Sequence, residues 1–181
     1  MEAGKPLQPF HQEDWLQPIQ LQASAELHNS QLRLRFELWD PSGSLVLPAS
    51  KSAPQRCDGL WQSTCFEAFF AKGGDPGYWE LNLAPSGDWN AYRLDGYRQG
   101  LRPEATIQQL PHRIERSGQG LVLDLELSLA QLIDQASELE LSLAAVLDQQ
   151  RHGCSYWACN HRACEPDFHQ RSSFEAIPKR K

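Results

Sequence analysis

The 181-residue sequence lacks any long apolar run: no stretch approaches the ~18 consecutive apolar residues that mark a membrane-spanning helix. Residues 1–12 contain acids, prolines and glutamines where an export signal would need an apolar segment. Basic charge is also scarce, since the net charge is −6 and the one dense basic run is residues 179–181. We therefore expect a cytoplasmic protein that binds neither a membrane nor nucleic acid.

The sequence also lacks the motifs that identify many enzymes. It has no GxSxG or HExxH motif, no phosphate-cradling glycine loop and no Cys-His pair in a familiar context. Met1 is the only methionine, so we do not expect haem held by a Met and a His, and we expect no other cofactor. The five cysteines include no CxxC pair, and an odd count without an export signal indicates reduced thiols.

Potential metal ligands gather near the C-terminal end: Cys154, Cys159, His161, Cys164, Asp167 and His169. Structural zinc favours ligands about two to four residues apart in paired knuckles, whereas these cysteines recur every five residues. On a strand, that spacing puts successive thiols on opposite faces. An iron site of two histidines and one carboxylate is an alternative interpretation. We expect local packing and hydrogen bonding here, and no metal.

Strict alternation of apolar and polar residues is the strongest structural pattern, and it occurs over residues 19–27, 32–38, 121–129 and 139–147. Leucine dominates these segments and favours helices, but a two-residue period is wrong for a helix face and typical of a half-buried strand. The turn-like residues 28–30 separate the first two segments, which indicates a hairpin.

The middle of the chain predicts further strands at residues 60–71, 78–83, 89–94 and 107–116. Glycine and proline at residues 72–77 predict a tight turn, so the first two of these strands should form a second hairpin. Residues 41–56 should form a loop over one mouth of the fold, and residues 128–135 a helical turn. We expect an all-β protein: a single antiparallel β-sandwich domain over residues 1–181, jelly-roll-like, with at most one or two short helices.

Glu67 is unusual because it lies inside an aromatic-rich segment that starts near Trp61. Six residues of extended strand span roughly 20 Å, so these two side chains can meet one ligand only if a bend or bulge separates them. In the next predicted strand, Glu80 and Asn82 alternate with apolar residues and share a face. If the two strands pair as a hairpin, Glu67 and Asn82 can project from the same surface.

Several patterns together resemble a known family. They are W-x5-E from Trp61 to Glu67, the strand end N-L-A-P-S-G from Asn82, and W-x2-Y-R from Trp89. The segments YW at residues 156–157, His161 and PDFH at residues 166–169 complete the set. Over about residues 60–169 the sequence resembles the bacterial branch of the DOMON-like domains that are related to carbohydrate-binding module family nine.

The resemblance implies a β-sandwich with a ligand site on one concave face or at one rim. In the sugar-binding relatives, tryptophans stack on the sugar faces, while an acid and an asparagine hydrogen-bond hydroxyl groups. Carried over to this sequence, Trp61 is a platform, Glu67 the acceptor and Asn82 the amide partner. The candidates for a second platform are Trp89, Tyr92 and Trp157.

The same residues also have structural interpretations. The tryptophans can be core side chains, and Asn82 can cap the turn at residues 85–87. Glu67 can face solvent, with Arg93 or Arg98 as its partner. The functional alternatives are an enzyme that uses Glu67 with a histidine, or with Glu80 as a glycosidase pair, and a structural or partner-binding module without a small ligand. Our primary expectation is a non-catalytic domain that binds a small, sugar-like ligand.

Overall fold

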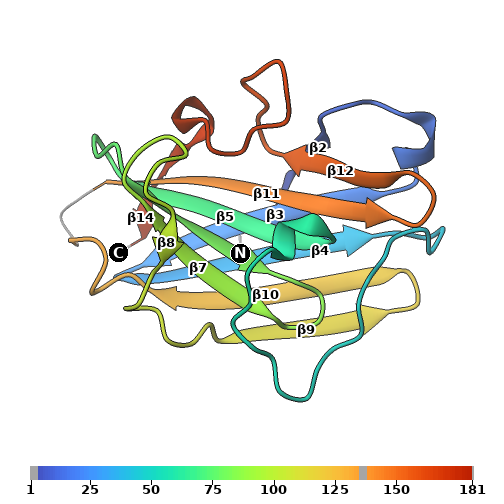
Figure 1. The fold of residues 1–181 in the computed structure, drawn as a ribbon, viewed down its shortest axis with the longest axis horizontal. Coiled ribbons are helices and arrows are strands. Elements are labelled where there is room, and N and C mark those ends of the chain that lie inside the picture. The colour runs from blue at the N-terminus through green and yellow to red at the C-terminus, as the bar shows by residue number, and fades with distance from the viewer. Residues whose placement is uncertain (1–3, 135–137, 181) are drawn as a thin grey trace.

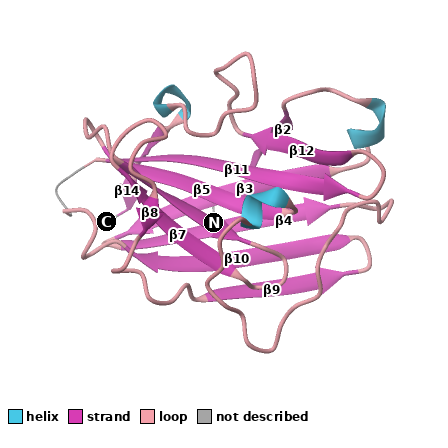
Figure 2. Ribbon diagram, in the orientation of Figure 1, coloured by secondary structure: helices cyan, strands magenta, loops and turns pink. Residues whose placement is uncertain are grey.

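The computed structural model describes residues 4–134 and 138–180, which form two β-sheets stacked face to face (Figures 1 and 2). Sheet A has the order β1 (Lys5–Pro6), β3 (Gln20–His28), β4 (Gln31–Trp39), β10 (Gly120–Ser128) and β9 (His112–Ser117), and β14 (Lys179–Arg180) pairs with β3. Sheet B has the order β2 (Gln8–Pro9), β12 (Gly153–Ala158), β11 (Leu139–Gln149), β5 (Cys65–Lys72), β6 (Tyr78–Leu83), β7 (Trp89–Leu94) and β8 (Arg102–Pro103), and β13 (Glu175–Ile177) pairs with β11.

The facing surfaces of the two sheets make one hydrophobic core, because alternate residues of each strand point inward. In sheet A, Leu34 of β4 lies opposite Leu125 of β10, and Phe36 lies opposite Leu123. All four side chains are buried. The four alternating segments of the sequence are confirmed as β3, β4 and β10, which pair antiparallel in sheet A, and β11, which pairs antiparallel with β5 and β12 in sheet B. The antiparallel β-sandwich is confirmed as well.

Sheet B differs from sheet A in being buried on both faces. In β5, Phe66 and Phe70 point into the core between the sheets, whereas Phe69 points outward. Phe168 and Phe174, from the chain that follows β12, pack over this outer face. Polar side chains on the outer face of the central strands β5 and β6 are therefore shielded from water, and the functional site described below lies there.

The predicted strand over residues 107–116 is shorter in the structure and begins only at His112. Ile107 and Leu110 are buried from an irregular segment, and Pro111 has no N–H to donate to a strand ladder. Burial of those two apolar side chains, and not strand pairing, explains the apolar pattern of residues 107–110.

The helical turn predicted over residues 128–135 does not form a helix in its described part, residues 128–134. β10 continues to Ser128, and the amides of Leu132 and Ile133 then both donate to the carbonyl of Leu129 in a single turn. Residue 135 lies outside the described residues. The short helical elements present are the 3₁₀ turns η1 (Asp14–Leu16), η2 (Leu60–Gln62) and η3 (Arg171–Ser173).

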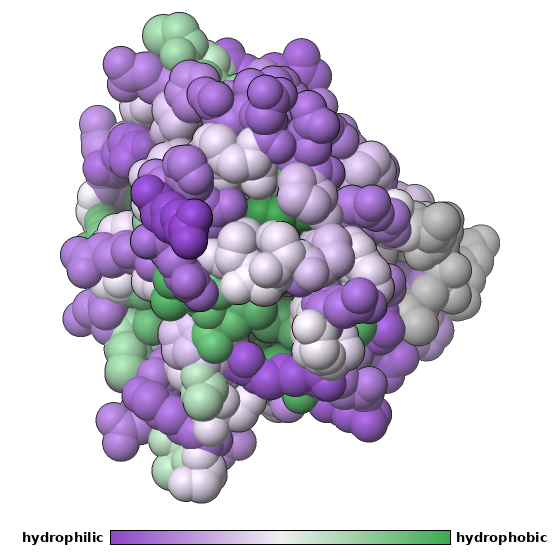
Figure 3. Space-filling view, turned by 90° about the vertical axis from the view of Figure 1, so that its right-hand side faces the viewer, coloured by the Kyte–Doolittle hydropathy of each residue, from purple (hydrophilic) through white to green (hydrophobic). Residues whose placement is uncertain are grey.

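The surface at the right-hand end of the sandwich in Figure 1 is mostly hydrophilic, with apolar side chains visible between the polar ones (Figure 3). Among the described residues, no helix has the length and apolar character needed to cross a bilayer.

Candidate functional site

The β5–β6 hairpin brings polar side chains together on the outer face of sheet B. Glu67 lies directly opposite Asn82 in the antiparallel register, and Glu80 lies two residues from Asn82 on the same face. The inward neighbours Trp79 and Leu81 belong to the core between the sheets. The hairpin predicted from the glycine-rich turn therefore places these three polar residues on one surface.

Trp61 reaches this surface through a bend that precedes β5. Gly59 has a φ of 75°, a left-handed conformation that glycine adopts without strain, and it opens the 3₁₀ turn η2 that carries Trp61. The turn replaces the first part of the strand predicted from residue 60, so β5 begins at Cys65. The Trp61 side chain is 38% exposed, and its ring centre lies 6.0 Å from that of Tyr92.

A hollow of about 340 Å³ lies beside Trp61, and we call it the outer hollow. Its lining residues are Trp61, Glu67, Glu80, Leu94, Arg98, Leu101, Val146, Tyr156, Pro166, Phe168 and His169. They come from η2, β5, β6, β7, β11, β12, the turn after β7 and the segment after β12. The volume falls in the range of small-ligand pockets, and the wall combines apolar and aromatic groups with a few polar ones.

Two buried carboxyl groups form the polar part of the hollow. Glu67 and Glu80 are 3% and 5% exposed. The amide nitrogen of Asn82 donates to Glu80 Oε1 over 2.9 Å, whereas Glu67 Oε1 and Asn82 Oδ1 are buried without a hydrogen-bond partner. Unpaired buried acceptors are costly, so each needs a donor from water or a ligand.

Burial raises the pKa of Glu67 well above its ordinary value, and the neighbouring Glu80 carboxylate raises it further. Burial also raises the pKa of Glu80, although the hydrogen bond from Asn82 and the charge of Arg98 oppose that effect.

A network of charged and aromatic groups holds the rim of the hollow. Arg98 binds Asp167 over 2.8 Å, and the Tyr97 hydroxyl donates to the same carboxylate over 2.6 Å. Burial alone would raise the pKa of Asp167, but these hydrogen bonds lower it to about 2. The Tyr78 hydroxyl lies 2.9 Å from Nδ1 of His169. Burial and the charge of Arg98 lower the pKa of His169 to about 4, so this ring is neutral near pH 7.

Of the six residues proposed from sequence, two line the outer hollow, two lie behind it and two lie in the core between the sheets. Trp61 and Glu67 line the outer hollow. Asn82 and Tyr92 lie on the same face but behind it: Asn82 binds Glu80, and the Tyr92 hydroxyl donates to Asp58 over 2.8 Å. The lining also includes Arg98, Tyr156, Phe168 and His169, which were not among the ligand-site residues predicted from the sequence. Two of them belong to the PDFH run.

Trp89 and Trp157 require a correction, because the structure places both in the core between the sheets. Trp89 lies opposite the inward Leu83, and Trp157 lies opposite the inward Ala145. Strand alternation therefore directs both rings away from the outer hollow. Arg93, one of the two arginines considered as a partner for Glu67, instead packs over the Trp79 ring, with its guanidinium carbon 4.0 Å from the ring centre.

Three of the potential metal ligands near the C-terminal end, Asp167, His169 and His161, have separate partners. Asp167 binds Arg98, His169 contacts Tyr78, and Nε2 of His161 donates to the Gln8 carbonyl over 2.8 Å. All five cysteines are free thiols. Within residues 4–134 and 138–180, no group of three or more His, Cys, Asp and Glu side chains is arranged to hold a metal ion.

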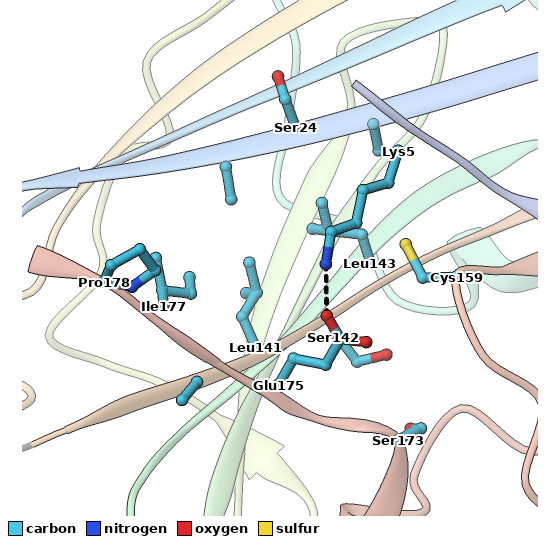
Figure 4. Close-up of a pocket in the computed structure, with 13 residues that line it drawn as sticks. Lys5, Ser24, Leu141, Ser142, Leu143, Cys159, Ser173, Glu175, Ile177 and Pro178 are labelled. Carbon is cyan, nitrogen blue, oxygen red and sulfur yellow. Dashed lines mark hydrogen bonds and ion pairs between the residues drawn. The ribbon is translucent and has the colours of Figure 1, made fainter. Parts of the chain in front are cut away.

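A second, smaller hollow of about 140 Å³ lies between β3, β11 and β13 (Figure 4). Lys5 extends across it and pairs with Glu175 over 2.5 Å. Leu141, Leu143 and Ile177 form much of its apolar wall. Because its two charged groups neutralise each other, this hollow has weaker features for polar recognition than the outer hollow.

The raised carboxyl pKa values of the outer hollow predict a specific dependence of stability on pH. Folded Glu67 holds its proton more tightly than the unfolded side chain, so its contribution to stability is lost as pH rises from the ordinary value through the folded pKa. The loss is about 1.4 kcal/mol for each unit by which folding raises the pKa. Glutamine does not titrate, so we expect the free energy of unfolding of Glu67→Gln, relative to that of the wild-type protein, to increase as the pH rises above about 4.5.

Urea unfolding of both proteins across a pH series measures this difference directly. The comparison is needed because His169, whose pKa folding lowers to about 4, makes stability rise with pH between that value and about 6.5. That effect is common to both proteins and cancels. A stability difference that does not change with pH would show that Glu67 titrates normally.

Similarity to solved structures places the fold among known proteins. No family model matches the sequence, and a comparison with curated proteins finds no match. Among solved structures, a carbohydrate-binding module of family 9 from Caldicellulosiruptor kristjanssonii in complex with glucose has a TM-score of 0.60 at 14% identity, covering 99% of this chain and 85% of that one. A module of that family and organism in complex with cellotriose has a TM-score of 0.52 at 13% identity, covering 86% and 71%.

A protein from Bacteroides uniformis, described as carbohydrate-binding, has a TM-score of 0.62 at 11% identity, covering 94% of this chain and 84% of that one. At these identities the likeness establishes a shared fold. The chain has the β-sandwich fold of carbohydrate-binding modules of family 9.

Proposed function

We propose that this protein binds a small sugar-like ligand in the outer hollow without transforming it. As part of the same proposal, the chain is a single DOMON-like domain that acts in the cytoplasm and belongs to the bacterial branch of that group. The fold shared with modules that bind glucose and cellotriose supports a sugar ligand.

One observation carries the proposal: a partly exposed tryptophan ring borders a hollow that contains an unpaired, buried acceptor. A flat indole such as Trp61 can cover the C–H face of a sugar ring, while Glu67 Oε1 can accept a hydrogen bond from a hydroxyl. Tyr156 and Phe168 supply further aromatic surface on the wall of the same hollow. This combination of ring faces and a few placed polar atoms is what a polyol requires.

A second candidate is an enzyme that acts on such a ligand. It is favoured by the two carboxyl groups with raised pKa values, and by neutral His169 in the same hollow. A protonated Glu67 could serve as a general acid. Incubation of the purified protein with glycosides, followed by chromatography, separates the two candidates: unchanged glycosides support binding alone, and Glu67-dependent release of free sugar supports catalysis.

The expected effect of Trp61→Ala tests the binding proposal. Loss of the indole platform should weaken the binding of a monosaccharide about tenfold, because an aromatic contact contributes roughly 0.5–1.5 kcal/mol in addition to the apolar area that it buries. Isothermal titration calorimetry measures the change in Kd.

The matched control is Trp39→Ala, which removes a similarly exposed tryptophan, 43% exposed, from the end of β4 in the other sheet. The control should leave the Kd unchanged. Equal losses in both variants, or no loss in Trp61→Ala, would contradict the placement of the ligand.

A further inference from the structure

The polar floor of the outer hollow offers unpaired acceptors and little positive charge. Glu67 lines the hollow and is only 3% exposed. Its Oε1 has no hydrogen-bond partner. Glu80 adds a second carboxyl group, with one oxygen bound to Asn82. Among the described lining residues, Arg98 is the only Arg or Lys, and it already forms an ion pair with Asp167.

The other titratable and charged groups that surround these carboxyls do not supply a counter-charge. They are Cys65 on β5, Tyr78 on β6, Tyr92 on β7 with Asp58 beside it, Tyr156 on β12, and Asp167 and His169 after β12. All are neutral or acidic near pH 7 in their ordinary forms, and His169 is kept neutral there by burial and by Arg98. Apart from Arg98, the described lining of the outer hollow therefore contains no cation near pH 7.

A ligand ammonium group complements this arrangement better than a hydroxyl does. An ammonium brings a positive charge and three N–H donors, whereas a hydroxyl brings one donor and no charge. Charge-assisted hydrogen bonds are about twice as strong as neutral ones. A cation beside the pair would also favour the ionised carboxylates, so binding should release protons.

We propose that the ligand of the outer hollow is an amino sugar, whose ring lies against Trp61 and whose primary ammonium group binds the Glu67 carboxylate beside Glu80. The proposal rests on the sugar-binding function proposed above and specifies its ligand class.

Calorimetric titrations of the full chain near pH 7 with D-glucosamine, D-glucose and N-acetyl-D-glucosamine test the proposal. D-Glucosamine should bind at least about tenfold more tightly than D-glucose, since a hydrogen bond between charged groups is stronger than one between neutral groups. N-Acetyl-D-glucosamine, whose nitrogen carries no charge, should bind no better than D-glucose. Repeating the D-glucosamine titration in buffers of different ionisation enthalpy should show proton release.

The variant Glu67→Gln keeps the shape of the side chain and removes its charge. It should reduce the preference for D-glucosamine over D-glucose to less than about threefold, while D-glucose still binds. The control Glu115→Gln changes an exposed glutamate of β9 that pairs with Arg113, and it should keep the full preference. Circular dichroism confirms that each variant is folded.

The possible outcomes separate this inference from the function on which it rests. Equal affinity of the wild-type protein for D-glucosamine and D-glucose would overturn the amino-sugar inference and leave sugar binding intact. Binding of neither sugar would overturn both. A preference that persists in folded Glu67→Gln would overturn the role given to Glu67. The comparison of sugars on the wild-type protein decides the inference even if the variant does not fold.

Discussion

Replacing Arg56 with alanine should lower the free energy of unfolding by about 3 kcal/mol, because it removes four hydrogen bonds from a charged donor and leaves the carbonyl oxygens of Glu104 and Ile107 without that donor. The guanidinium donates to Asn90 Oδ1 and to the carbonyl oxygens of Ala91, Glu104 and Ile107, over 2.6–2.9 Å. It also lies over the Trp89 ring, 5.1 Å from the ring centre. One side chain thus ties the loop before Trp61 to β7 and to residues 104–107.

The Arg56→Ala effect should reach the outer hollow, since Asn90 and Tyr92 also hold Asp58 next to the turn that carries Trp61. Urea unfolding gives the stability change. The control is Arg33→Ala: Arg33 is 63% exposed and pairs with Glu126 on the surface, so its loss should cost less than about 1 kcal/mol. Similar losses in the two variants would show that Arg56 has no special anchoring role.

Gly120→Ala should be strongly destabilising, by more than about 3 kcal/mol, because the strand backbone leaves no space for a side chain. Gly120 has a φ of 152°, and a Cβ atom there would lie within 1.9 Å of the Leu38 carbonyl oxygen on the neighbouring strand. Relief of that overlap requires β10 and β4 to separate at this point.

Gly118 provides a control for Gly120 in the same turn. A Cβ atom at Gly118 meets no atom within 4 Å, so Gly118→Ala should change stability by less than about 0.5 kcal/mol. Thermal unfolding of both variants measures the contrast. A mild effect of Gly120→Ala would show that this edge of sheet A adjusts its backbone easily.

The strands of sheet A were predictable because they have one buried face. Alternation is visible in the sequence of β3, β4 and β10, and the hairpin at Asn29 joins the first two. Sheet B is buried on both faces, which removes the alternation from β5. The cover for Phe69 comes from Phe168 and Phe174, about a hundred residues later, and local sequence does not specify that contact.

The candidate site was predictable only for residues whose position is decided by strand pairing alone. The glycine-rich turn between β5 and β6 places Glu67, Glu80 and Asn82 on one face. Trp89 and Tyr92, three residues apart, cannot share a face of one strand, and the register decided which one points outward. Arg98 depends on a turn in which it adopts a φ of 52°, a rare conformation that residue identity does not predict.

Amide chemical-shift mapping of ¹⁵N-labelled protein during titration with D-glucosamine tests most directly that the outer hollow is the ligand site. We expect the largest shifts in β5, β6, residues 97–101 and residues 166–169, together with the indole N–H of Trp61, because these groups surround the hollow. Shifts concentrated around Trp39 on sheet A, or the absence of any localised shift at saturating ligand, would contradict the account.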